Sequence, residues 1–77
     1  MGEAYRRVSG RELIRILEEF GWYIHRIRGS HHVMRHPDVP RVTLSVPAHG
    51  NQTLPVGTQV SILKDAGIGA DEFNERA

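Results

Sequence analysis

The sequence predicts an α+β domain in which a three-stranded antiparallel sheet carries two helices on one face. Two segments with apolar residues at helical spacing lie toward the two ends of the chain, and three segments rich in β-branched or alternating residues lie between them. Glycine and proline separate these segments. At 77 residues the chain forms one domain with a thin core, since a chain of this size buries only about 60% of its unfolded surface.

The first helix is predicted to begin after Ser9 and to end at Gly21. Ser9 and Glu12 have the spacing of a capping box, in which each side chain accepts a hydrogen bond from the other residue's backbone. An apolar stripe at i, i+3, i+4 and i+7 follows, formed by Leu13, Ile16, Leu17 and Phe20. This stripe predicts a helix that buries one face in the core.

Three strands are predicted over residues 22–28, 31–36 and 41–46. A Gly-Ser turn joins the first two, and residues 37–40, with two prolines, form the turn before the third. The third segment alternates between inward Val42, Leu44 and Val46 and outward Thr43 and Ser45. We therefore expect an antiparallel meander with one apolar and one polar face.

The second helix is predicted to begin near Pro55 and to end at Gly67, with Ile68 as the apolar residue that follows. Its core face is expected to carry Val56, Val60, Leu63 and Ala66. Both helices are expected to cover the sheet face that carries Met34, Val42, Leu44 and Val46, which leaves the opposite face open. The residues from Asp71 onward are expected either to form a short last helix or to fray.

The composition excludes several classes of site and location. Without cysteine, neither a disulfide framework nor a thiolate metal site is available. No apolar run approaches the roughly 20 residues that span a bilayer, and the N-terminus lacks the apolar segment of a secretion signal, so we expect a cytoplasmic protein. His31 and His32 are adjacent and point apart, and Asp38 is the only nearby carboxylate. We therefore expect no zinc site and no cofactor.

Positive charge is concentrated in the middle of the chain, although the formal net charge is only +1. Between residues 22 and 49, Asp38 is the single carboxylate, against Arg26, Arg28, Arg35 and Arg41. The planar guanidinium presents a fork of donors that suits phosphate oxygens, so these arginines indicate a nucleic-acid surface. A solvated basic face without a ligand is the alternative.

Three of the five histidines lie within residues 31–36, directly after the Gly-Ser turn signal. An unperturbed imidazole, with a pKa of about 6.5, gives or takes a proton near neutral pH. Alternation along a strand places His31 on the same face as Arg35. His32 points to the other face together with Met34, which favours a packing role for His32.

From Glu12 to Gly67, the order and spacing of these segments resemble the HicA family of small bacterial mRNA interferase toxins. The matching pieces are Leu13-Ile14-x-x-Leu17-Glu18, Gly21-Trp22, Gly29-Ser30-His31-His32, Arg35-His36-Pro37, Val42-Thr43, Val46-Pro47, Leu54-Pro55-x-Gly57-Thr58 and Ser61-Ile62-Leu63-Lys64-x-Ala66-Gly67. The resemblance implies a fold like that of double-stranded-RNA-binding domains, metal-independent cleavage of mRNA, and a HicB-like antitoxin that covers the active histidine. A core of about 9–68 is expected, with an N-terminal extension (1–8) and an acidic tail (69–77) outside it.

The resemblance also implies which residues act. Family members carry a catalytic histidine in the Gly-Ser-His-His turn, which corresponds to His31 or, as the alternative, His32. The alternation favours His31, where an arginine on the same face would hold a phosphate and bring a ribose 2′-OH to the ring. The expected RNA-contacting residues are Gly29, Ser30, Arg26, Arg28, Arg35, Arg41 and Lys64. His36, His49 and Lys64 stay open as groups that assist the proton transfers.

Two functions are compatible with this pattern. One is an RNase toxin that cleaves single-stranded mRNA, and the other is an RNA-binding module that does not cut. They share the basic, histidine-rich surface and differ in whether RNA degradation requires His31. The chain departs from the family pattern at Met34, where an aromatic is common, and at Gln59, where leucine is usual. We interpret both departures as variation in the core.

Overall fold

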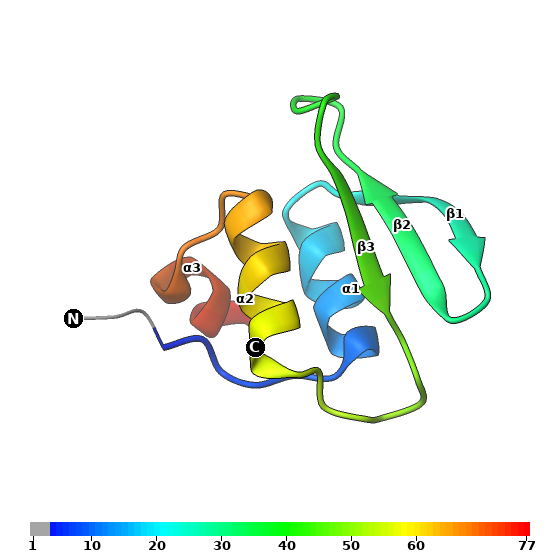
Figure 1. Ribbon diagram of the computed structural model, residues 1–77. Coiled ribbons are helices and arrows are strands. Elements are labelled where there is room, and N and C mark those ends of the chain that lie inside the picture. The colour runs from blue at the N-terminus through cyan, green and yellow to red at the C-terminus, as the bar shows by residue number, and fades with distance from the viewer. Residues whose placement is uncertain (1–3) are drawn as a thin grey trace.

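The computed structural model describes residues 4–77 and contains a three-stranded antiparallel sheet with helices on one side (Figure 1). The elements, in chain order, are α1 (Gly10–Glu19), β1 (Tyr23–Arg28), β2 (His31–Arg35), β3 (Thr43–Pro47), α2 (Val56–Asp65) and α3 (Ala70–Arg76). The strands lie in the order β1-β2-β3, so the predicted meander and the α+β class are confirmed. No helix in this part of the chain is long and apolar enough to cross a membrane.

Helix α1 begins and ends at the predicted signals. The Ser9 hydroxyl accepts a hydrogen bond from the Glu12 N–H (3.2 Å), and the Glu12 carboxylate accepts one from the Ser9 N–H (2.9 Å). The Ser9 backbone N–H, followed by the Ser9 side chain, holds the pKa of the Glu12 carboxyl below its usual value. At the other end Gly21 has a φ of +97°, and the Trp22 N–H donates to the Leu17 carbonyl (3.1 Å). This is the Schellman motif, in which glycine is favoured.

One face of the sheet is buried against the helices. Met34, Leu44 and Val46 point into this core, and the pairing of β2 with β3 sets Met34 opposite Leu44. The helices and connections contribute further buried side chains, including Leu13, Ile16, Leu17, Trp22, Ile62, Leu63 and Phe73. Thr43 and Ser45, on the other face, are exposed. The prediction of one covered and one open face is therefore confirmed for β2 and β3.

Strand β1 lies at the edge of the sheet, away from α2 and α3 (Figure 1), and all six of its residues are exposed. Its pairing register with β2 shifts between Ile24 and Arg26, which is a β-bulge. The extra residue reverses the alternation along the strand. Tyr23, the partner of Arg35, therefore lies on the same face as Arg26.

The predicted core face of α2 is wrong in its first turn. Val56 is 56% exposed, whereas the buried residues of the helix are Gln59, Ile62 and Leu63. Gln59 is buried because its amide pairs with the N-terminal backbone. Its oxygen accepts from the Val8 N–H (3.1 Å), and its nitrogen donates to the Arg6 carbonyl (2.6 Å). The interpretation of Gln59 as variation in the core is therefore confirmed, and hydrogen bonds at both ends of the amide allow a polar side chain there.

Both ends of the described chain are part of the domain. Helix α3 buries Phe73, and the ring of Tyr5 packs edge-on against it with 5.7 Å between centroids. The Tyr5 hydroxyl donates to the Ile68 carbonyl (2.6 Å). The residues from Asp71 onward therefore form a helix rather than fray. Residues 1–3 of the predicted N-terminal extension lie outside the described residues.

Candidate functional site

A two-residue turn, Gly29-Ser30, joins β1 to β2 and brings His31 to one end of the sheet. Arg28 and His31 are paired residues, so only Gly29 and Ser30 lie between the strands. Gly29 has a φ of +60°, and every positive φ in the described chain belongs to glycine. A positive φ at the first turn residue alone is typical of a type II′ turn, which favours glycine there. The predicted turn is confirmed, and it fixes Arg28 as the residue opposite His31.

The open face of the sheet consists of three rows of cross-strand partners. From the turn outward, the rows are Arg28, His31 and Pro47; then Arg26, Val33 and Ser45; then Tyr23, Arg35 and Thr43. Successive rows lie about 7 Å apart, because two residues separate them along a strand. Each row contains one arginine. The open face therefore presents a line of guanidinium groups with a histidine at one end.

His31 is exposed and lies next to a second histidine from the loop after β3. The ring centroids of His31 and His49 are 6.5 Å apart, and the ring planes are nearly perpendicular, at 84°. The Nε2 atom of His49 lies 3.1 Å from the Ser30 hydroxyl, and the Ala48 N–H donates to the Ser30 carbonyl (2.8 Å). These two bonds attach the loop to the turn. Of the three assisting groups that the sequence left open, His49 is the one beside His31.

His36 has a different environment, just beyond the opposite end of β2. Its Nε2 atom lies 2.9 Å from the Phe20 carbonyl, and its Nδ1 atom accepts a hydrogen bond from the Asp38 N–H (3.0 Å). Because Nδ1 is an acceptor, Nε2 carries the proton and donates to Phe20. Trp22 packs against the ring edge-on, with 5.3 Å between centroids. Since both ring nitrogens are bonded, His36 is a structural residue.

His32 lies on the covered side of the sheet. It pairs with the buried Val46, and its side chain is half-buried. Its Nδ1 atom is buried without a hydrogen-bond partner among residues 4–77. The alternation therefore has the predicted phase, with His31 on the open face and His32 on the other.

The arginine nearest to His31 is Arg28, in the same row. Arg35, which the sequence placed on the same face, lies four residues along β2 from His31, a span of about 13 Å. Its guanidinium donates to the Pro40 carbonyl (2.8 Å). Arg28 is exposed, and its guanidinium has no hydrogen bond or ion pair to another described residue. A phosphate next to His31 would therefore meet Arg28 before Arg35.

Two of the expected cations lie elsewhere, and one aromatic residue was missed. Arg41 is exposed in the β2–β3 connection, at the end of the sheet remote from the turn, and Lys64 is exposed on α2 behind the sheet. Tyr23 is 47% exposed in the third row of the open face. Strand alternation could not reveal Tyr23, because the bulge that brings it to this face leaves no clear sequence signal. The opposition of Arg28 and His31, in contrast, follows from any two-residue turn.

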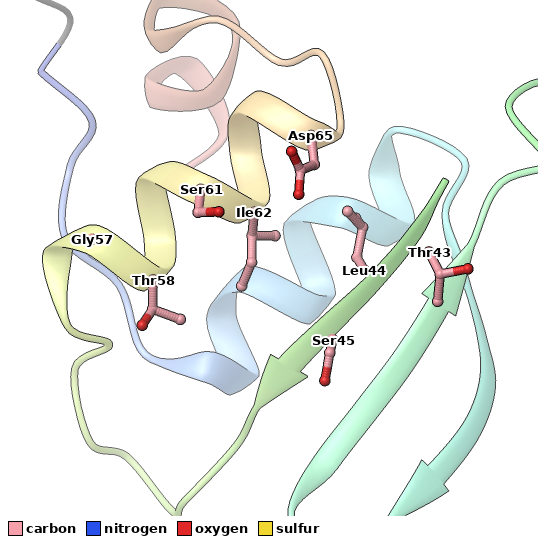
Figure 2. Close-up of a pocket in the computed structure, with 8 residues that line it drawn as sticks. All are labelled: Thr43, Leu44, Ser45, Gly57, Thr58, Ser61, Ile62 and Asp65. Atoms are coloured by element: carbon pink, nitrogen blue, oxygen red, sulfur yellow. The ribbon is translucent and has the colours of Figure 1, made fainter. Parts of the chain in front are cut away.

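A groove of about 510 Å³ lies between β3 and α2 (Figure 2). Its polar lining consists of hydroxyls and one carboxylate, from Thr43, Ser45, Thr58, Ser61 and Asp65. The groove has no imidazole or cation in its lining, whereas cleavage of a phosphodiester by proton transfer calls for a base and a positive group. Within residues 4–77, no three His, Cys, Asp or Glu side chains are grouped as metal ligands would be. The histidine pair at the turn is therefore the candidate site.

Comparison with known families places most of the chain in one family. Residues 10–68, more than half of the chain, match the model of a family described as the HicA toxin of bacterial toxin-antitoxin. A comparison with curated proteins found no significant match. The matched segment contains the whole sheet, the Gly29-Ser30 turn, and both His31 and His49. The chain therefore belongs to the HicA toxin family of bacterial toxin–antitoxin systems.

Proposed function

We propose that this toxin is an endoribonuclease that cleaves single-stranded mRNA by histidine acid/base chemistry. The observation that carries the proposal is the exposed imidazole of His31 opposite the exposed guanidinium of Arg28, at one end of a basic face. A guanidinium holds a phosphate in a defined orientation, and an imidazole next to it is in reach of a ribose hydroxyl. Membership of a toxin family supports cleavage of RNA over binding alone.

In the proposed reaction, His31 is the general base. With the scissile phosphate held by Arg28, a ring nitrogen of His31 takes the proton of the adjacent ribose 2′-OH. The 2′-oxygen forms a bond to phosphorus while the bond from phosphorus to the 5′-oxygen breaks. Once the departing 5′-oxygen has taken up a proton, the products are a 2′,3′-cyclic phosphate and a 5′-hydroxyl end. A positioned base of this kind contributes about 10²–10⁴-fold to the rate, and the reaction requires no metal.

The remainder of the open face is proposed as a track for the RNA strand. Arg26 and Arg35 supply a cation in the second and third rows, and Tyr23 offers an exposed ring on which a base can stack. Arg41 extends the positive surface beyond the third row. Gly29 and Ser30 bring the turn backbone next to the cleavage site, and a Cβ added at Gly29 would meet open space. Lys64, behind the sheet, is not part of this track.

The proposed partner is a HicB-like antitoxin that inhibits by covering the open face. RNA and antitoxin then compete, because the arginines of this face and the ring of His31 serve both. A toxin directed at mRNA is proposed to act in the cytoplasm. Family membership supports an antitoxin partner.

The test compares RNA oligonucleotides that differ by a single oxygen atom. We expect the protein to cleave the ribose form and to leave uncut the same RNA with 2′-deoxyribose at the cut nucleotide, because the nucleophile is missing. An RNA with its one deoxyribose elsewhere is the matched control, and added chelator is expected to change nothing. Cleavage of the deoxy substrate, or a requirement for divalent metal, would contradict the proposal. Tight binding without cleavage would favour an RNA-binding module.

A further inference from the structure

We propose that His49 is the general acid of this cleavage and protonates the 5′-oxygen as it leaves. The inference rests on the proposed function, since it assigns the second proton transfer of the same reaction. A base alone activates the 2′-OH, but the departing 5′-oxygen is a strongly basic alkoxide unless another group supplies a proton. The pair of imidazoles at the turn provides one ring for each transfer.

The positions of the two rings suit a shared phosphodiester. His31 begins β2, and His49 approaches it from the loop after β3, with 6.5 Å between ring centroids. A group that exchanges a proton must lie about 2.6–3.2 Å from the oxygen concerned. A separation of this size lets one bound phosphodiester contact both rings, with the 2′-oxygen at His31 and the 5′-oxygen at His49.

Ser30 orients the His49 ring. The Ser30 hydroxyl lies 3.1 Å from Nε2, and within residues 4–77 no hydrogen bond occupies Nδ1. Both nitrogens of a protonated imidazole are donors, so Nε2–H is directed at the serine oxygen and Nδ1–H remains for the leaving group. The bond from the Ala48 N–H to the Ser30 carbonyl holds the loop in this position (2.8 Å).

The two proton transfers of the proposed reaction balance. His31 gains the 2′-OH proton, the bond from the 2′-oxygen to phosphorus forms, and the bond from phosphorus to the 5′-oxygen breaks. Protonated His49 gives its Nδ1 proton to the 5′-oxygen. One proton enters the protein and one leaves it. Because both rings are exposed, exchange with water restores the starting protonation states.

Other proton donors of residues 4–77 are poorly placed for this role. His36 uses both ring nitrogens in bonds to the backbone, and His32 faces the helices. The guanidinium of Arg28 does not release its proton in proteins. Lys64 lies behind the sheet, and the Tyr23 hydroxyl belongs to the third row of the open face, two rows from His31.

The test uses two RNA oligonucleotides of one sequence, one with the natural 5′-oxygen at the cut and one with a bridging 5′-sulfur. Sulfur leaves as a thiolate without a proton, because a thiol is a much stronger acid than an alcohol. We expect the His49→Ala substitution to slow cleavage of the natural RNA by about 10²–10⁴-fold. The rate on the sulfur RNA is expected to stay within a few-fold of that of the unsubstituted protein. His31→Ala is expected to slow both, since each cleavage begins at the 2′-OH.

The matched control is His25→Ala, a change at another exposed histidine of the sheet, and it is expected to leave both rates unchanged. Equal losses on the two RNAs in His49→Ala, or no loss on either, would overturn the general-acid role. His49→Gln is measured in parallel, and thermal unfolding shows that each variant is folded. Either of these two outcomes for His49→Ala is compatible with the proposed function as long as His31→Ala is inactive. Full activity of His31→Ala, in contrast, would overturn the proposed function itself.

Discussion

A histidine and an arginine lie at each end of β2, but the hydrogen bonding of their side chains differs between the two ends. At the turn end, His31 and its row partner Arg28 are both exposed. At the far end, both ring nitrogens of His36 are bonded, and Arg35 donates to the Pro40 carbonyl. A histidine and an arginine thus form a candidate reactive site at one end, whereas at the other end both side chains bond the backbone. The hydrogen-bond partners of these side chains, rather than their types, separate the two roles.

The difference originates in the backbone around each end. The turn at Gly29-Ser30 has only two residues, so it supplies few backbone groups to bond a neighbouring side chain. The far end meets the C-terminus of α1 and a longer connection over residues 36–42. Those segments provide the Phe20 carbonyl and the Asp38 N–H that bond the His36 ring.

The contrast between the two ends of β2 predicts that His36 contributes more than His31 to the free energy of unfolding. His36→Ala removes the contact with Trp22 and leaves the Phe20 carbonyl and the Asp38 N–H without their partner, so we expect the free energy of unfolding to fall by about 3 kcal/mol. His31→Ala, at an exposed position, is expected to change it by less than about 0.5 kcal/mol. Urea unfolding followed by circular dichroism measures both values. Losses of similar size would contradict the assignment of His36 as structural and His31 as free.

The two glycines that flank β1, Gly21 and Gly29, offer a second measurement of the difference between the two ends of β2. A Cβ at Gly21, where φ is +97°, would lie 2.6 Å from Nε2 of His36, whereas a Cβ at Gly29, where φ is +60°, would meet nothing within 4 Å. Gly29→Ala is expected to cost about 1 kcal/mol through backbone strain alone. Gly21→Ala is expected to cost about 2 kcal/mol, because it also displaces the His36 ring from its hydrogen bond. Thermal unfolding distinguishes the two, and equal losses would show that the His36 bond contributes little.

The arginines of the two ends are expected to differ in cleavage more than in binding. Each substitution, Arg28→Ala or Arg35→Ala, is expected to weaken RNA binding by about 1 kcal/mol and to lower the salt slope by about 0.7 log units, the value for one phosphate on a single strand. Arg28→Ala is also expected to slow single-turnover cleavage of saturating RNA by about tenfold, since it holds the reacting phosphate. Titrations of labelled RNA at several salt concentrations, with single-turnover rates, separate these effects. A slower reaction in Arg35→Ala than in Arg28→Ala would reverse the comparison.

The smallest expected effect concerns Glu12, at the start of α1 and outside both regions. Its pKa in the folded protein lies below the usual value of 4.5, so the ionised carboxylate favours the folded state. That contribution is complete above about pH 4.5 and is lost as the pH falls through the lowered folded pKa. Glu12→Gln is expected to remove this part of the acid dependence of the melting temperature and to leave RNA cleavage unchanged. If the melting temperatures of the two proteins depended on acid pH in the same way, this expectation would be contradicted.

The features that depend on a few neighbouring residues were predictable from the sequence. The capping box at Ser9 and Glu12, the helix end at Gly21 and the Gly-Ser turn each need a stretch of only a few residues, and all are confirmed. Alternation likewise gave the correct face for His31. In each case, the physical cause lies within the segment that carries the pattern.

The features that were missed depend on distant parts of the chain or on an irregularity. The core position of Gln59 was expected, but the partners of its amide were not: they are backbone groups of Arg6 and Val8, some 50 positions away. The bulge in β1 turns Tyr23 to the open face. The position of His49 beside His31 depends on a loop that returns to Ser30 across 19 positions. No periodic pattern in the sequence encodes such contacts.

The central claim, that the base lies on the open face of the sheet, is tested most directly by single-turnover RNA cleavage with His31→Ala and His32→Ala. The two residues are neighbours in the chain and point to opposite faces. We expect His31→Ala to cleave about 10²–10⁴-fold more slowly than the unsubstituted protein, and folded His32→Ala to cleave within a few-fold of it. An inactive, folded His32→Ala beside a fully active His31→Ala would contradict the claim and place the base on the covered side.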